Sequence, residues 1–288
     1  MANNLKTVAL LGFLGGVFVV VGWALGGTTG ALVALGFAAA MNLFMYFNSD
    51  KLALRSARAQ PLSESDAPQL HAIVRTLAER QGMPMPRLYL IDAPQPNAFA
   101  TGRSPKHAAV AVTSGILQIM TPQELEGVLA HELAHVANRD ILISTVAATI
   151  GAAVTFLSRM ALWSSMGRRR DSGAAGLVMS LVAMILAPIV ALIVQMAISR
   201  SREFQADRSG ALTTGSPLGL ASALHKLERG TSQIPMQVDP AVSQLFIADP
   251  LKALEGRRGG NALTRLFSTH PPIDERIARL EQMASGIR

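Results

Sequence analysis

Four long apolar runs dominate the order of apolar and polar residues along the chain. They cover residues 8–25, 31–47, 141–163 and 176–198. Each approaches or exceeds the roughly 18 to 20 residues that cross a bilayer as a helix. The first run has no evident small-residue cleavage site and a second run follows at once, so we read it as retained rather than as a signal peptide. The pattern predicts membrane-embedded helices separated by polar segments.

The apolar runs group into two predicted hairpins. The short link at residues 26–30, GGTTG, joins the first two runs, so residues 1–50 are expected to form an N-terminal transmembrane hairpin. Residues 141–198 are expected to form a second membrane hairpin. The polar stretches 51–140 and 199–288 then become the two parts of one domain that the second hairpin interrupts.

The polar parts read as mainly helical with a few strands. The start of one helix is the clearest, because Thr121 is placed as its N-cap, Pro122 as its first residue and Glu124 as the partner that completes a capping box. A hairpin-like piece with Gly102 and Pro105 at its turn lies between two short strands. The predicted class is mainly α with a small β-sheet, that is α+β. The other expected elements are helices over 66–81, 201–230 and 272–283 and strands over 87–92 and 108–113.

Composition supports the membrane interpretation and limits the chemistry. Of the 288 residues, 50% are hydrophobic and only 16% are charged, with a mean hydropathy of +0.32. A soluble domain of ordinary composition is more polar than this. The chain has no cysteine, which excludes disulfides, a thiol nucleophile and thiolate metal ligands. Any metal site must therefore use His, Asp or Glu.

The net charge of +7 is explained by basic residues beside the apolar runs. By the positive-inside rule, Lys6, Lys51 and Arg200 place both termini and the polar domain in the cytoplasm. The stretch 168–170 lies between two apolar runs without interleaved aromatic residues, so we expect no nucleic-acid partner. The triple arginine at 168–170 disagrees with this topology. Either the rule fails locally, or the second hairpin does not fully cross the bilayer.

The sequence "HELAH" at 131–135 predicts a zinc site. His131 and His135 are four residues apart and so lie on one face of a helix, where both imidazoles reach one metal ion. Glu132 lies beside them, placed as the general base that acts on a water activated by the metal. A catalytic zinc site needs a third protein ligand and keeps its fourth position for water.

The third ligand is expected in "SREFQAD" at 201–207. Glu203 and Asp207 are also four residues apart on a predicted helix. One of them can bind the metal while the other holds a ligand histidine by its second nitrogen. The alternative is an exposed helix in which Arg202 and Arg208 balance the two acids. Spacing alone does not decide between these readings, nor between the two carboxylates.

The two candidate ligand segments lie at the two ends of the second predicted hairpin. The helix with the histidines runs into residue 141, and the segment with the carboxylates follows residue 198. Closing the hairpin brings these ends together and assembles the site at the bilayer surface. Natural substrates would then be chains that emerge from the membrane or are misfolded in it.

Several longer motifs carry a resemblance to a known family. They are "PNAFATGRSPKHAAVAVTSGIL" at 96–117, "LAHELAHVANRDIL" at 129–142, "SREFQADRSGA" at 201–211 and "FSTHPPIDERIARL" at 267–280. With these motifs and its paired N-terminal segments, the chain resembles the HtpX family of bacterial membrane metalloproteases, in the same superfamily as the eukaryotic CAAX prenyl protease. The resemblance covers nearly the whole chain.

The resemblance implies a gluzincin-type zinc endopeptidase, multi-pass in the bacterial inner membrane, with its active site facing the cytoplasm. It implies that His131, His135 and Glu203 bind one Zn²⁺ per chain and that Glu132 is catalytic. It also implies that the substrates are misfolded or damaged membrane proteins, cleaved in quality control. Asp207 is then expected to support a ligand histidine. The rival reading is a zinc-stabilised scaffold or chaperone-like binder without activity, in which Glu132 would have no purpose.

Residues near the expected strands are candidates for substrate binding. Asn97, Ala98, Phe99 and Ala100 precede the turn and are expected to form an edge strand that pairs with an extended substrate. The alternative is an ordinary edge strand with no partner.

Two residues near the C-terminus are candidates for stabilising the oxyanion. His270 in "STHPP" is expected to donate a hydrogen bond to the negative charge that develops on the scissile carbonyl oxygen. Arg276 is a second candidate for this role. The alternatives are that His270 belongs to a helix-entry turn and that Arg276 is a surface charge.

Overall fold

The computed structural model describes residues 2–142, 144–145, 200–254 and 271–286. Nearly all of the second predicted membrane hairpin lies outside the described residues, as does His270. Within the described residues the chain is mostly helical with one small mixed sheet, which confirms the predicted fold class.

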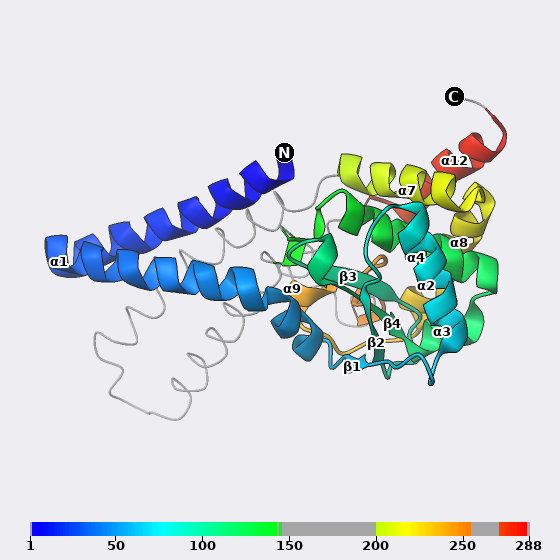
Figure 1. Ribbon diagram of the computed structural model, residues 1–288, viewed down its shortest axis with the longest axis horizontal. Coiled ribbons are helices and arrows are strands. Elements are labelled where there is room, and N and C mark those ends of the chain that lie inside the picture. The colour runs from blue at the N-terminus through cyan, green and yellow to red at the C-terminus, as the bar shows by residue number, and fades with distance from the viewer. Residues whose placement is uncertain (1, 143, 146–199, 255–270, 287–288) are drawn as a thin grey trace.

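Helix α1, Ala2–Ser56, contains both N-terminal apolar runs. The backbone leaves helical geometry at Gly26 and Gly27, and Gly27 has a φ of 59°, which favours glycine. The chain turns back here, so that α1 forms two arms in Figure 1. A Cβ on Gly15 of the first arm would lie 3.8 Å from Asn42 Nδ2 on the second, which shows that the arms pack together.

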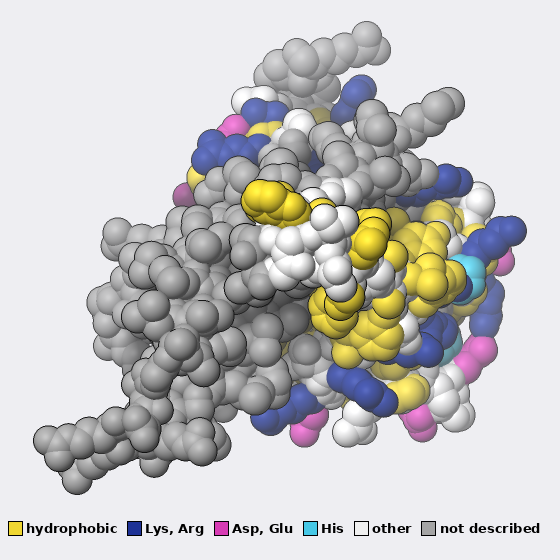
Figure 2. All heavy atoms as spheres, turned by 90° about the vertical axis from the view of Figure 1, so that its left-hand side faces the viewer, with side chains coloured by type: hydrophobic (Ala, Val, Ile, Leu, Met, Phe, Trp, Pro, Cys, Tyr) yellow, Lys and Arg dark blue, Asp and Glu magenta, His cyan; other side chains and the backbone are white. Residues whose placement is uncertain are grey.

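The outer surface of α1 is apolar. Residues Gly26–Phe44 have the length and hydropathy of a membrane-spanning helix, and only 6% of this stretch is buried. Large side chains such as Trp23 and Phe37 are more than half exposed. Figure 2 looks onto this end of the molecule and shows hydrophobic side chains gathered there, with Lys and Arg lying farther out. Apolar exposure on this scale fits a lipid environment.

The sheet has four strands in the order β1-β2-β4-β3. Strand β2 pairs in parallel with β4, whereas β1 and β3 pair antiparallel with their neighbours. Within this sheet β3 is an edge strand, as the sequence predicted. The bounds are β1 Gln60–Pro61, β2 Arg87–Ile91, β3 Ala98–Gly102 and β4 Ala108–Thr113, and the short 3-10 helix η1, Pro105–His107, joins the last two.

Both faces of the sheet are covered. Alternate residues of β3 and β4, such as Ala98 and Val110, pack into a core with the helices, and the residues between them, such as Phe99 and Ala111, pack against the end of α1 and residues 236–246. The helices are α2 Pro68–Arg80, α3 Ser114–Ile119, α4 Pro122–Ala137, α7 Arg200–Thr214, α8 Pro217–Gln233, α9 Pro240–Ser243 and α12 Ile273–Ala284.

Helix α4 lies at the centre of this arrangement and contacts β3, α2, α7 and α8 (Figure 1). It begins with the predicted capping box, in which the Thr121 hydroxyl accepts from the Glu124 N–H and the Glu124 carboxylate accepts from the Thr121 N–H.

Glycines let the helices next to α4 approach it closely. A Cβ on Gly210 of α7 would lie 2.9 Å from the backbone nitrogen of His131. The backbones of α4 and α7 are thus nearly in contact where the candidate ligands lie.

Candidate active site and metal centre

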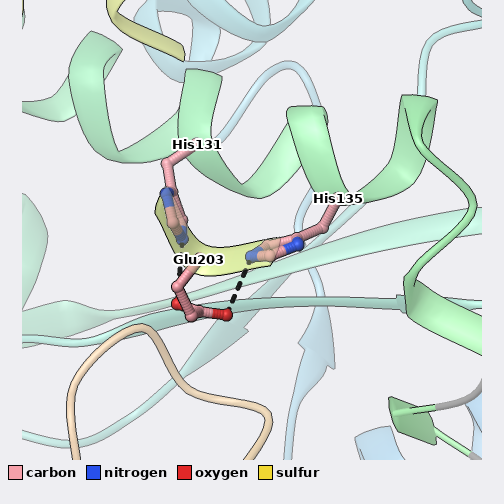
Figure 3. A group of neighbouring side chains, drawn as sticks. All are labelled: His131, His135 and Glu203. Carbon is pink, nitrogen blue, oxygen red and sulfur yellow. Dashed lines mark ion pairs between the residues drawn. The ribbon is translucent and has the colours of Figure 1, made fainter. Parts of the chain in front are cut away.

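The three candidate ligands meet between α4 and α7. His131 and His135 lie one turn apart on α4, and their rings are perpendicular with centroids 4.8 Å apart. Glu203, in the first turn of α7, faces both rings (Figure 3). Its Oε1 lies 3.3 Å from His135 Nε2, and its Oε2 lies 3.7 Å from His131 Nε2.

This group is suited to a metal ion. One ligand atom from each of the three residues lies within 4.8 Å of the others. Two imidazole nitrogens and a carboxylate oxygen form the protein ligand set of a catalytic zinc site. The three side chains line a cavity of about 40 Å³, which has room for an ion and a water. The residues therefore fit a divalent metal with three protein ligands.

Asp207 contacts the Nδ1 atom of His131, and Arg276 in turn holds Asp207. The Nδ1 of His131 lies 2.9 Å from Asp207 Oδ1, so the imidazole donates there and its Nε2 points toward Glu203. Arg276 of α12 donates to both Asp207 oxygens, at 2.8 and 2.7 Å. The Arg276 side chain is fully buried, and its Nη1 also donates to the Ile247 carbonyl. The alternative of a surface charge at Arg276 is therefore wrong.

Asp140 supports His135 in the same way, and the sequence reasoning missed it. Its Oδ2 lies 3.4 Å from His135 Nδ1. Helix α4 has ended at Ala137, and Arg139 takes a positive φ of 60° that turns the chain back toward the helix. The only signal in the sequence was an acid five residues after a ligand histidine, a spacing that does not lie on one helix face.

The pKa values of the two histidines are shifted in opposite directions by their surroundings. Burial, together with the positive charge of Arg276, lowers the pKa of His131 to about 4, so this imidazole is neutral and its Nε2 lone pair is available. Burial would also lower the pKa of His135, but Glu203 and Asp140 outweigh it and raise that pKa to about 10. The carboxylates that draw a proton to His135 would equally draw a divalent cation, which releases that proton on binding.

Glu132 is held beside the ligands by strand β3. The Ala100 N–H donates to Glu132 Oε2 at 2.8 Å, and the side chain is buried. Burial raises the pKa of Glu132 to about 7, with Glu203 acting in the same direction. A carboxylate with a pKa near neutral is suited to both accepting and returning a proton.

Part of the strand that was predicted to bind substrate already pairs with another segment of the same chain, residues 246–248. The Asn97 side chain donates to the Ala248 carbonyl at 2.8 Å and accepts from the Ala248 N–H at 3.3 Å. Ile247 N–H donates to the Ala98 carbonyl at 3.0 Å, and Phe99 forms an antiparallel bridge with Phe246. Residues 246–248 therefore extend the sheet at the first half of the predicted edge. Among the four predicted residues, Ala100 is the one that lines the metal cavity.

Two neighbouring histidines in an HExxH helix, a glutamate from a second helix and a glutamate beside them define a metallopeptidase of the gluzincin type. The comparison with known families agrees. Residues 64–284 match the model of peptidase family M48, and this is more than half of the chain. The chain belongs to this family and is an M48 metalloprotease.

Close relatives refine this assignment. The chain is 52% identical to a "Protease HtpX homolog" of Persephonella marina over 98% of both chains. It is 50% identical to a protein of the same description from Pelotomaculum thermopropionicum, over 98% of this chain and 99% of that one. The protein is therefore an HtpX-type membrane metalloprotease that acts on protein substrates, which sets the scaffold alternative aside. A solved structure, Ste24p of S. mikatae, matches 97% of this chain and 66% of its own length at 18% identity and a TM-score of 0.48.

Proposed function

We propose that this protein is a zinc-dependent endopeptidase of the bacterial inner membrane that cleaves misfolded or damaged membrane proteins. The observation that carries this proposal is the convergence of His131, His135 and Glu203 next to the buried Glu132. We propose that the active site faces the cytoplasm, because the positive-inside rule places the basic flanks of the apolar runs there.

The three ligands would hold one Zn²⁺ per chain. When bound, zinc supplies Lewis-acid polarisation of the scissile carbonyl and lowers the pKa of a water. Glu132 takes the proton of the attacking water and passes it to the leaving amine. Its Oε2 is held by the Ala100 N–H, so the carboxylate keeps one orientation during both transfers. Asp207 and Asp140 hold the Nδ1 atoms of the two histidines, which leaves both Nε2 atoms facing Glu203, where the ion would bind.

The remaining candidates take different parts in this proposal. His270 would donate to the oxyanion. Arg276 is better suited to holding Asp207, because its Nε and Nη2 already donate there and its Nη1 donates to Ile247. For Asn97–Ala100, we propose that an extended substrate pairs with the sheet edge from the Ala100 carbonyl onward, since the Ala98 carbonyl accepts from Ile247 and the Ala100 N–H donates to Glu132.

The domain organisation supports membrane substrates. We propose that 51–140 and 199–288 form one catalytic domain and that a second membrane hairpin, 141–198, lies between them, behind the N-terminal hairpin of 1–50. Ile141 and Ser144, at the start of that predicted hairpin, line the metal cavity. A metal site that shares residues with the start of a membrane segment lies close to the bilayer, where misfolded membrane segments are accessible.

The ligand assignment is tested by zinc content. Glu203→Ala should bind far less zinc than the wild type in equilibrium dialysis, because one of three protein ligands is lost. Gln205→Ala, an exposed change on the same helix, should keep one zinc per chain. Circular dichroism on both variants checks that they are folded. Unchanged zinc stoichiometry in folded Glu203→Ala would contradict the assignment of Glu203.

The substrate class is tested in vesicles. The wild type and Glu132→Gln are reconstituted with a membrane protein in its native form and in a destabilised form. The proposal expects the wild type to cleave the destabilised form faster and Glu132→Gln to cleave neither. Equal cleavage of both forms would contradict the preference for misfolded proteins but leave the peptidase intact.

A further inference from the structure

Arg202 is a buried cation in the wall of the metal cavity. It precedes the ligand Glu203 on α7, and only 8% of its surface is exposed. Its Nη1 and Nη2 atoms are buried and contact no hydrogen-bond acceptor in the part of the chain that the structure describes. Arg276, the other buried arginine at the site, differs in this respect because Asp207 and Ile247 accept its hydrogen bonds.

An arginine in this situation requires a partner. Burying a guanidinium group without hydrogen bonds is costly, and native proteins rarely leave such donors unsatisfied. Asp140 and Glu203 are the carboxylates whose charges act on Arg202, but neither forms an ion pair with it within 4.0 Å. Asp140 contacts His135 instead, and Glu203 contacts His135, His131 and Arg276. The Nη donors of Arg202 are therefore available to a molecule that enters the cavity.

The charges around the cavity indicate which atom that molecule presents. Glu132, Asp140 and Glu203 line the same cavity, so a carboxylate group of a substrate would lie beside three acidic side chains. A main-chain carbonyl oxygen is neutral, accepts two hydrogen bonds and is present at every residue of a peptide. Ala100 and Leu245 line the same cavity as Arg202, and Ala100 belongs to the sheet edge at which an extended main chain is proposed to pair.

We propose that Arg202 is a substrate-binding residue whose Nη1 and Nη2 donate to a main-chain carbonyl oxygen of the bound peptide beside the metal. This inference rests on the proposed peptidase function. It adds a positive donor on α7 that holds the peptide independently of the sequence of its side chains. Substrate binding would then complete the hydrogen bonding of a cation that the fold buries in advance.

Peptide binding tests this role without turnover. Fluorescently labelled peptides of acidic, neutral and basic sequence are titrated into zinc-loaded Glu132→Gln in detergent, and Kd is measured by anisotropy. Adding Arg202→Gln should weaken binding on the order of 10–100-fold for all three peptides, the effect of hydrogen bonds to a charged group. Arg202→Lys should recover part of the loss, because an ammonium keeps the charge but not the planar pair of donors.

Arg208→Gln is the matched control, since Arg208 lies on the same helix with its side chain exposed. It should leave every Kd unchanged, and all variants should keep one zinc per chain. An unchanged Kd in Arg202→Gln would overturn the proposal. A loss confined to the acidic peptide would overturn it in favour of side-chain recognition, and a loss of zinc would show that Arg202 supports Asp140 and Glu203. Wild-type protein that binds peptides but cleaves none would contradict the proposed function alone.

Discussion

Asp207 and Arg276 show, at the scale of single residues, how a ligand is supported from outside the metal site. Asp207 is buried and lies between two positive or donating groups, His131 Nδ1 and the Arg276 guanidinium. Although burial would raise it, the charge of Arg276 holds the pKa of Asp207 well below its usual range. The carboxylate therefore stays ionised and fixes the tautomer of His131.

Removing the negative charge of Asp207 should lower zinc affinity, although none of the candidate metal ligands is changed. Asp207→Asn keeps the shape but removes the anion that accepts two hydrogen bonds from the buried Arg276 and leaves only Glu203 at 3.8 Å, so we expect a loss of stability of about 3–5 kcal/mol. Zinc affinity should fall about 10–100-fold, as for other groups that orient metal ligands. A competition assay with a chelator measures the affinity, and thermal unfolding measures the stability. Wild-type values for both would refute this support role.

Sequence spacing could predict part of this site. The four-residue spacings of His131 and His135 and of Glu203 and Asp207 follow from the helical repeat. Spacing could not say which carboxylate faces the metal, because that depends on how α7 is rotated against α4. It also could not reveal the pairing of Arg276 with Asp207, two residues that are 69 positions apart.

At the scale of elements, the site depends on the close approach of α4 and α7. Gly210 lies against the backbone of Ala130 and His131, where a side chain has no room. Gly127 of α4 is similarly close to the backbone of Leu220 in α8. The separation between the histidines on α4 and the glutamate on α7 therefore depends on Gly210, which is not itself a candidate ligand.

A methyl group at Gly210 should push the two helices apart. Its Cβ would lie 2.9 Å from a backbone nitrogen, which cannot move as a side chain can. We expect Gly210→Ala to lower stability by about 1–3 kcal/mol, the usual cost of overpacking. Zinc affinity should fall as well, whereas Gln205→Ala on the exposed face of α7 should change neither. Wild-type zinc affinity in Gly210→Ala would show that the helix separation is not critical.

Glu124 gives the start of α4 a dependence on pH. Its carboxylate accepts from the Thr121 N–H, Ser222 and Lys226, which together outweigh burial and lower the pKa of Glu124 from 4.5 to about 2. A lowered folded-state pKa adds stability above pH 4.5 that is lost as the pH falls toward 2.

The matched variant for this effect is Glu124→Gln. It should be less stable than the wild type by on the order of 3 kcal/mol at pH 7, because it lacks the ionised form. The difference should shrink as the pH falls from 5 to 2. Denaturant unfolding at a series of pH values measures it. A difference that does not change with pH would contradict the ionised role of Glu124.

Local elements were predicted well from the sequence, whereas a pairing between distant segments was not. The capping box of α4 and the strands β2 and β4 are local features, and they lie where the sequence placed them. The pairing of residues 246–248 with β3 is not local, because about 150 residues separate Asn97 from Ala248. No turn or repeat marks that pairing, so the edge of β3 was expected to be free along its whole length.

On the scale of the whole molecule, the sequence indicated a membrane protein by the length of its apolar runs. The structure describes the first pair as two packed arms of α1 with an apolar outer surface. The topology of 141–198 is still a prediction, because the described residues include only its first few positions. The candidate metal ligands come from helices on either side of that segment, so the site is built from two distant parts of the chain.

The central claim is that this site hydrolyses peptide bonds with Glu132 as the base. The most direct measurement compares casein cleavage by the purified wild type and Glu132→Gln in detergent with added zinc, with zinc content determined for both. The wild type is expected to cleave casein, and Glu132→Gln is expected to hold one zinc per chain without cleaving. Cleavage by Glu132→Gln at the wild-type rate would contradict it.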